Sequence, residues 1–173
     1  AGLISGERES GGWQLLQITP LRPVSIVVGK LLSVAWPLAL LLVATLPAYV
    51  VLIAIEPAHA MPVARGLVSL MLAAAGALLL SAAVSSCFRR TAPATATVYA
   101  LLVGLCLGTM LFWMGREAPF TGQVVEAVLR FNPLAAALSA IEAPGFADLR
   151  LLPFNWWFMG ALCALSTLVL LAQ

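Results

Sequence analysis

Charged residues are absent from four long stretches of this chain. All sixteen Asp, Glu, Lys and Arg residues lie outside the runs 31–55, 66–88, 91–115 and 151–173. Each run is 23 to 25 residues long, and a helix needs roughly 20 apolar residues to cross a hydrocarbon core of about 30 Å. Backbone groups in lipid must pair within their own segment, and the alternation typical of membrane strands is missing. The pattern predicts four transmembrane helices in one all-α, polytopic domain over residues 1–173.

The links between the runs predict the orientation in the membrane. Four crossings place both ends of the chain on one side, with the segments 56–65 and 116–150 on the other. Region 1–30 and the Arg89-Arg90 link hold five Lys or Arg residues, whereas the opposite segments hold four. Short basic links follow the positive-inside bias most reliably. We therefore predict that region 1–30 is cytoplasmic and that 116–150 is an external helical loop.

The external loop 116–150 has a helical pattern of its own. Apolar residues recur at helical spacing from 121 to 131, which predicts an amphipathic helix. Asn132 suits an N-cap and Pro133 a first helical position, so a second helix is expected from there to about Glu142. The two helices either lie in the interface or dip inward as a re-entrant hairpin. A lid over the spans and a role in substrate release are both open interpretations.

Small residues recur every four positions in two of the spans. In the second span they are Ala73, Ala77, Ser81 and Ser85. In the third span they are Ala96, Ala100, Gly104 and Gly108. Such stripes let helix backbones approach closely, which favours association in lipid. We predict helix packing through the stripe in the third span, with packing inside the subunit favoured over a dimer seam.

The composition argues against several classes of function. Apolar residues make up 62% of the chain and charged residues 9%, against about 45–50% and 25% in soluble domains. The chain contains no block of Lys and Arg residues of the kind that binds nucleic acid. The four runs contain no charged residue that would couple transport to an ion, and the spacing of Cys87, Cys106 and Cys163 is not that of a metal or redox site. We expect no catalysis, no cofactor and no metal.

Region 1–30 carries the most specific pattern in the chain. A charged triplet at 7–9 precedes glycines and a short amphipathic segment that includes Trp13. Pro20 ends this segment, and Pro23 can start a helix that runs into the first span. The residues alone allow two interpretations, an interfacial helix that anchors the span and a helix that docks on a partner.

The sequence resembles the ABC-2 type permease family, the membrane subunits of ATP-driven exporters. Members typically carry Glu-Arg-Glu, a Leu-rich turn, Thr-Pro-Leu, and Gly-Lys at the head of a span. The matching positions are Glu7-Arg8-Glu9, Gly11, Leu15-Leu16, Thr19-Pro20-Leu21 and Gly29-Lys30. The chain departs at Gly12, where Thr is usual, and at Gln14, where Glu is frequent. Further segments that resemble the family are Phe88-Arg89-Arg90, Ala94-Thr95-Ala96 and Asn132-Pro133-Leu134. The resemblance covers essentially the whole chain.

The resemblance implies a fold and partners. Family members commonly have six spans with this motif after the second, which would make this chain the part from that loop through the sixth span. It implies a separate or fused ABC ATPase, so this chain is not itself an enzyme, and usually a second permease half, as a homo- or heterodimer. The segment that contacts the ATPase, called the coupling helix, would comprise Glu7, Arg8, Glu9, Gly11, Trp13, Leu16, Thr19 and Pro20. We expect an exporter subunit in a bacterial inner membrane, surrounded by lipid.

Two other functions are compatible with the sequence. A non-transporting membrane scaffold would use 116–150 to hold partners outside the cell. A secondary transporter is disfavoured because the spans are uncharged. Association with an ATPase would separate the permease from the scaffold. The identity of a transported substrate does not follow from the sequence.

Overall fold

The computed structural model describes residue Gly6 and residues 23–115 and 120–172, and every regular element in these ranges is a helix. The all-α class is confirmed. In chain order the elements are α3 (Pro23–Ile55), η1 (Pro57–His59), α4 (Ala60–Cys87), α5 (Thr91–Val103), η2 (Gly104–Gly108), α6 (Thr109–Met114), α7 (Gly122–Leu129), α8 (Pro133–Ala140) and α9 (Phe154–Leu171). η1 is a single 3₁₀ turn, and η2 is a π-helical turn inside the third span.

Four segments are long and apolar enough to cross a membrane, which confirms the predicted spans. They are Val28–Ile55, Pro57–Cys87, Thr91–Met114 and Phe154–Leu171. The second begins earlier than predicted because Arg65 does not interrupt the helix, and a long charged side chain near a span end can reach the interface. The fourth begins three residues later than predicted, at Phe154. Pro153 precedes it as the N-cap and has no amide hydrogen to donate.

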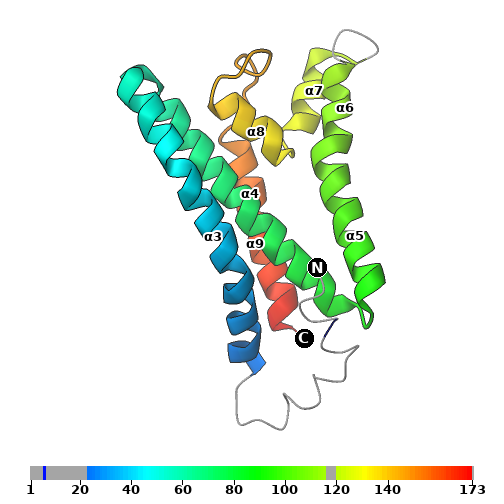
Figure 1. Ribbon diagram of the computed structural model, residues 1–173. Coiled ribbons are helices and arrows are strands. Elements are labelled where there is room, and N and C mark those ends of the chain that lie inside the picture. The colour runs from blue at the N-terminus through cyan, green and yellow to red at the C-terminus, as the bar shows by residue number, and fades with distance from the viewer. Residues whose placement is uncertain (1–5, 7–22, 116–119, 173) are drawn as a thin grey trace.

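The spans stand side by side, and the links between them lie at the two ends of the bundle (Figure 1). The start of α3 and the Arg89-Arg90 link lie at one end, and the turn at η1 lies at the other end with α7 and α8. α4 is the central helix, because α3, α5, α8 and α9 all pack on it. We call the end that carries α7 and α8 the hairpin end.

α3 is the most loosely held of the spans. Its main contacts are with α4 and η1, and none of its described side chains is buried. Large apolar side chains face outward along its length, among them Trp36, which is 65% exposed, and Leu41, which is 67% exposed. Such exposure is not penalised in a bilayer, because lipid tails are as apolar as the side chains. α3 therefore lies against the bundle without contributing to its buried core.

α4 packs closely on α9 through small residues. A Cβ placed on Gly76 would lie only 2.6 Å from Met159 Cε, a separation that real Cβ atoms essentially never show. Ser69 Oγ accepts a hydrogen bond of 2.9 Å from Trp156 Nε1 on α9. Ser69, Gly76 and the buried Ala83 are seven residues apart, which is close to two helical turns, so they share one face of α4. This row of small residues brings the two helices together.

The predicted stripe on α4 is only partly buried. Ser85 is buried, whereas Ala73, Ala77 and Ser81 are half-buried. On a helix of 3.6 residues per turn, each step of four residues rotates the position by about 40°, so a stripe of four such positions drifts around the helix. Positions seven apart drift by only about 20°. The close contact with α9 therefore follows the row of seven-residue spacing instead.

The stripe in the third span faces away from the rest of the described chain. Ala96, Ala100 and Gly104 are exposed and Gly108 is half-buried, and a Cβ on Gly104 would meet no atom within 4 Å. α5 is instead buried on another face, at Val98. The favoured interpretation, packing inside the subunit, is therefore not seen among the described helices. Packing through this stripe remains a prediction that requires a helix from elsewhere.

We predict that Gly76→Leu destabilises the protein much more than Gly160→Leu does. A leucine at position 76 would displace the buried Met159 side chain from the contact between α4 and α9, and overpacking of this kind costs about 1–3 kcal/mol. Gly160 on α9 is the matched control, because a Cβ there would meet nothing within 4 Å. Thermal unfolding in detergent measures both variants. Equal midpoints for the two would contradict the α4–α9 contact.

Candidate functional site

α7 and α8 form a hairpin between the third span and α4, with α7 against α6 and α8 against α4 (Figure 1). Both helices were predicted, and their boundaries agree within about two residues. α7 is amphipathic as expected, since Val125 and Leu129 are buried whereas Gln123 is exposed. The hairpin end therefore carries a packed helical structure rather than an irregular loop.

The hairpin has a hydrophobic core of its own. The buried side chains that form it are Val125, Leu129, Ala135, Ala136, Phe146 and Leu151. Trp113 of α6 stacks on Phe146 with ring centroids 4.9 Å apart, and its Nε1 donates a hydrogen bond of 3.3 Å to the carbonyl of Gly145. Ser139 Oγ donates to the carbonyl of Leu149 at 2.8 Å. The hairpin, the segment after it and the end of the third span are therefore one packed unit.

Asn132 occupies the turn between α7 and α8 and is fully buried. Its Oδ1 accepts hydrogen bonds from the backbone amides of Leu134 at 2.8 Å and Ala135 at 3.2 Å, which caps α8 as predicted. Its Nδ2 donates to the carbonyl of Cys106 at 2.8 Å and to Thr109 Oγ1 at 2.7 Å. One side chain therefore both starts α8 and fastens it to the third span.

The acceptors for Asn132 lie at the π-helical turn of the third span. Cys106 belongs to η2, and Thr109 follows directly and donates its own hydroxyl to the carbonyl of Leu105 at 2.6 Å. A π turn replaces the usual hydrogen-bond pattern of the α-helix and is often found at functional sites. An unpaired polar group in hydrocarbon costs several kcal/mol. The side-chain amide of Asn132 therefore donates hydrogen bonds to acceptors at the π turn, and neither partner is left unpaired.

The position of Asn132 shows that the hairpin dips into the bundle. Cys106 precedes Met114, the last residue of the third span, by eight residues, which is about 12 Å along a helix. Asn132 reaches Cys106 directly. Of the two arrangements that the sequence allowed, this contact favours the re-entrant one.

A second buried asparagine fastens the hairpin to the fourth span. Asn155, near the start of α9, is 1% exposed, and its Nδ2 donates to the carbonyl of Arg130 at 2.9 Å. Arg130 pairs through its side chain with Glu126 of α7, also at 2.9 Å. Sequence reasoning missed Asn155. The available signal was an amide side chain in an otherwise apolar run, where it needs a partner.

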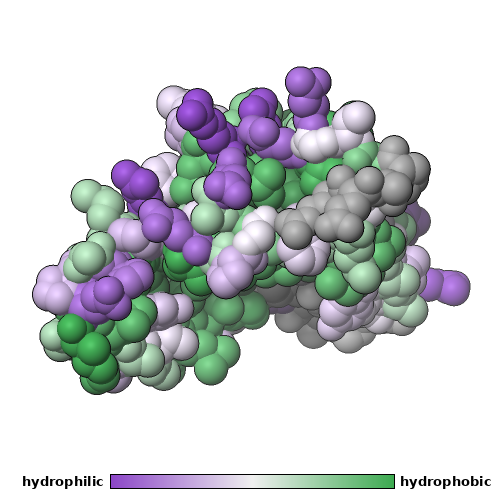
Figure 2. Space-filling model, turned by 90° about the horizontal axis from the view of Figure 1, so that it is seen from above, coloured by the Kyte–Doolittle hydropathy of each residue, from purple (hydrophilic) through white to green (hydrophobic). Residues whose placement is uncertain are grey.

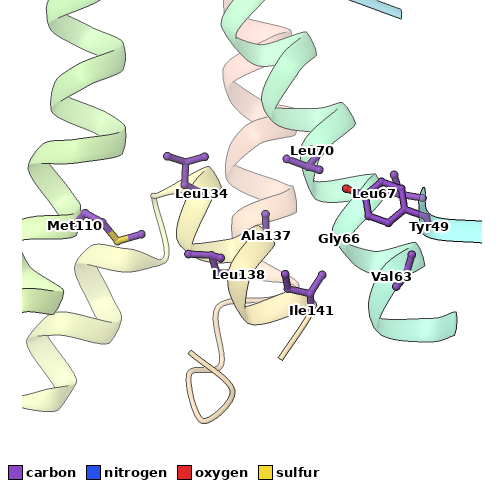
Figure 3. Close-up of a pocket in the computed structure, with 10 residues that line it drawn as sticks. All are labelled: Tyr49, Val63, Gly66, Leu67, Leu70, Met110, Leu134, Ala137, Leu138 and Ile141. Atoms are coloured by element: carbon purple, nitrogen blue, oxygen red, sulfur yellow. The ribbon is translucent and has the colours of Figure 1, made fainter. Parts of the chain in front are cut away.

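An apolar cavity of about 320 Å³ lies between the hairpin and the first two spans (Figure 3). One wall comes from α4, between Val63 and Leu70, with Tyr49 of α3 beside it. The other wall comes from α8, between Leu134 and Ile141, and Met110 of α6 adds to the lining. The cavity is partly open, so it is a slot between packed helices rather than a sealed void.

The comparison with protein families decides the identity. The model of the ABC-2 family of transporter proteins matches residues 1–172. The chain belongs to the ABC-2 transporter family. With its four apolar helices it is a multi-pass membrane protein and a permease component of an ABC transporter, and such permeases associate with an ABC ATPase and usually with a second permease. The comparisons with curated proteins and with solved structures found no match.

The coupling-helix residues predicted for this ABC-2 permease, from Glu7 to Pro20, lie outside the described residues. Gly6 precedes them, and the described part of the chain resumes at Pro23. A Cβ placed on Gly6 would lie 3.5 Å from Thr91 Cγ2 at the start of α5. Pro23 begins α3, as the sequence predicted. Both lie at the end of the bundle opposite to the hairpin (Figure 1).

The described residues of the ABC-2 permease contain no group of three or more His, Cys, Asp or Glu residues that could hold a metal ion. Cys87, Cys106 and Cys163 form no disulfide. The candidate functional features among the described residues are therefore the Asn132 contact and the apolar cavity beside it.

We predict that Asn132→Ala destabilises the protein by about 2 kcal/mol or more. The change removes a cap worth about 1 kcal/mol and leaves buried acceptors of the π turn without a donor, at about 1–3 kcal/mol. The matched control is Gln123→Ala on the exposed face of α7. Thermal unfolding in detergent compares the two, and a midpoint for Asn132→Ala as high as that of the control would refute this role.

Proposed function

We propose that this chain is the permease subunit of an ATP-dependent ABC-2 exporter in a bacterial inner membrane, driven by ATP hydrolysis on a partner ATPase. The family match over nearly the whole chain carries this proposal. The uncharged spans support it, because ion-coupled transporters usually keep charged groups within the bilayer. The energy for transport would therefore come from outside the spans.

The first span offers a direct route from the ATPase to the far side of the membrane. α3 is one helix of 33 residues, about 50 Å long, and it begins three residues after the predicted coupling helix. It has no described buried side chain, so it can shift without breaking the core. At its other end Tyr49 lines the apolar cavity. A movement at the ATPase would therefore reach the cavity through α3.

The orientation follows from charge. The Arg89-Arg90 link, Gly6 and the start of α3 lie at one end of the bundle, and the positive-inside bias assigns this end to the cytoplasm. The hairpin end would then be external. Figure 2 views this end and shows hydrophilic residues gathered on it among apolar ones. An external re-entrant hairpin beside an apolar cavity suits a permease that releases substrate on that side.

The scaffold alternative finds less support in the hairpin. A scaffold would present the segment 116–150 to external partners. Val125, Leu129, Ala135 and Ala136 of that segment are instead buried within this chain. The hairpin thus uses its apolar faces to pack against its own spans, which favours a role inside a transporter.

Cysteine labelling tests the orientation. On a background without the native cysteines, we expect His59→Cys and Gly122→Cys to react with a membrane-impermeant maleimide from outside intact cells. Ser10→Cys and Arg90→Cys should react only after permeabilisation, because they lie on the side that the positive-inside bias assigns to the cytoplasm. The reverse labelling pattern would overturn the orientation and with it the external hairpin.

Substitutions in the predicted coupling helix test the partnership with the ATPase. Trp13 and Leu16 are three residues apart in the sequence, and on the predicted helix they would form an apolar knob beside the charged triplet 7–9. A buried aromatic anchor contributes about 2 kcal/mol or more to binding, whereas an exposed charge contributes about 0.2–1 kcal/mol. Trp13→Ala should therefore weaken ATPase binding about thirtyfold, and Glu9→Gln much less.

The measurement is binding of the ATPase to the reconstituted full-length protein, together with the ATP hydrolysis rate, with membrane insertion checked separately. Intact binding and hydrolysis in both Trp13→Ala and the double variant Glu7→Lys/Glu9→Lys would show that this segment only anchors the span. In that case the coupling assignment would be wrong.

A further inference from the structure

The cavity beside the hairpin has walls that are almost purely hydrocarbon. Its lining is apolar apart from the phenol of Tyr49 and the thioether of Met110. A sealed apolar cavity of about 150 Å³ holds benzene. The present cavity is about 320 Å³, roughly twice that volume. It therefore accepts an apolar group larger than a single ring.

The shape of the cavity is that of a slot parallel to the helices. On α4 the lining runs from Val63 to Leu70, and on α8 from Leu134 to Ile141. Each stretch covers seven steps, which is about 10 Å along a helix. At the end of α8 the side chain of Ile141 packs directly on α4, since a Cβ on Gly66 would lie 2.7 Å from Ile141 Cγ2. A long, narrow apolar space suits an extended hydrocarbon chain.

The surroundings of the slot indicate where such a hydrocarbon chain would come from. Two of its walls belong to the membrane-spanning helices α3 and α4, and α3, which carries Tyr49, has no described buried side chain. In the bilayer core this part of the protein is surrounded by lipid hydrocarbon, and no water is present to occupy the slot. Each methylene that leaves water for such a site gains about 0.8 kcal/mol, but transfer from lipid gains only packing contacts, so occupancy depends on fit.

We propose that this slot binds one acyl chain of a membrane phospholipid from the leaflet at the hairpin end. Arg65, an exposed cation next to the lining residue Gly66, stands at the same end and suits a phosphate headgroup. The bound acyl chain fills the space between α3, α4 and the hairpin. The proposal requires only that the protein spans a membrane, and it holds whether or not the protein transports a substrate.

The test uses the full-length protein in lipid nanodiscs that contain a small fraction of phosphatidylethanolamine with a diazirine at the end of one acyl chain. After illumination, mass spectrometry locates the crosslinks. We expect them at Tyr49, Leu67, Leu70 and Leu138 well above the level at Trp36 and Leu41, which face bulk lipid. Crosslinks in the slot no more frequent than those at bulk-lipid positions would overturn the proposal.

Variants that fill the slot with a bulky side chain test whether the acyl chain binds there. Ala137→Phe places a ring in the slot from α8, and Leu70→Trp does so from the opposite wall, in case the first variant does not fold. Ala127→Phe on the exposed face of α7 is the control. A ring in the slot occupies the space that the acyl chain would fill, so slot crosslinks should fall to the level at Trp36 and Leu41 in the filled variants and not in the control.

Competition distinguishes a phospholipid from a free apolar compound. Unlabelled phosphatidylethanolamine should displace the probe from the slot, and dodecane, which has no headgroup, should do so much less. Displacement by dodecane alone would assign the slot to a free hydrocarbon and contradict the lipid assignment. Unchanged slot crosslinking in folded Ala137→Phe and Leu70→Trp would also overturn it.

Discussion

The hydrogen bonds of Asn132 hold the hairpin of α7 and α8 against the spans of this permease. A hairpin of two eight-residue helices cannot hold its place in a membrane by apolar packing alone, because lipid tails compete equally for apolar faces. Asn132 provides a directional contact, with two bonds into α8 and two into the third span. The π turn at Cys106 presents the acceptors at the required depth. The hairpin core, the re-entrant position and the cavity wall on α8 all depend on this contact.

The structure thus divides into a fixed part and a loosely held part. α4, α9 and the hairpin are joined by side chains that pack against Gly66 and Gly76 and by buried amides at Asn132 and Asn155. α3 has none of these features among its described residues, yet it extends from the predicted coupling segment to the edge of the cavity. A transporter that converts ATP hydrolysis into movement needs both a rigid frame and an element that can shift against it.

The local features of this fold could be predicted from the sequence, and the contacts between elements could not. Uncharged runs mark the spans because charge is costly in lipid, and Asn132-Pro133 marks a helix start because both residues suit one. The π turn and the partner of Asn155 depend on residues more than twenty positions away, so no local pattern shows them. The stripe at every fourth residue of α4 predicted the contact with α9 only in part. It drifts around the helix, whereas the residues that contact α9 are spaced seven apart.

The central claim is that this chain works as the membrane part of an ATP-driven transporter. The most direct measurement is purification of the full-length protein from its native membrane in a mild detergent, followed by identification of its partners and assay of ATP hydrolysis. The account predicts an ABC ATPase in stoichiometric amount and a complex that hydrolyses ATP. A protein that is purified intact with external partners only, and without any ATPase, would contradict it.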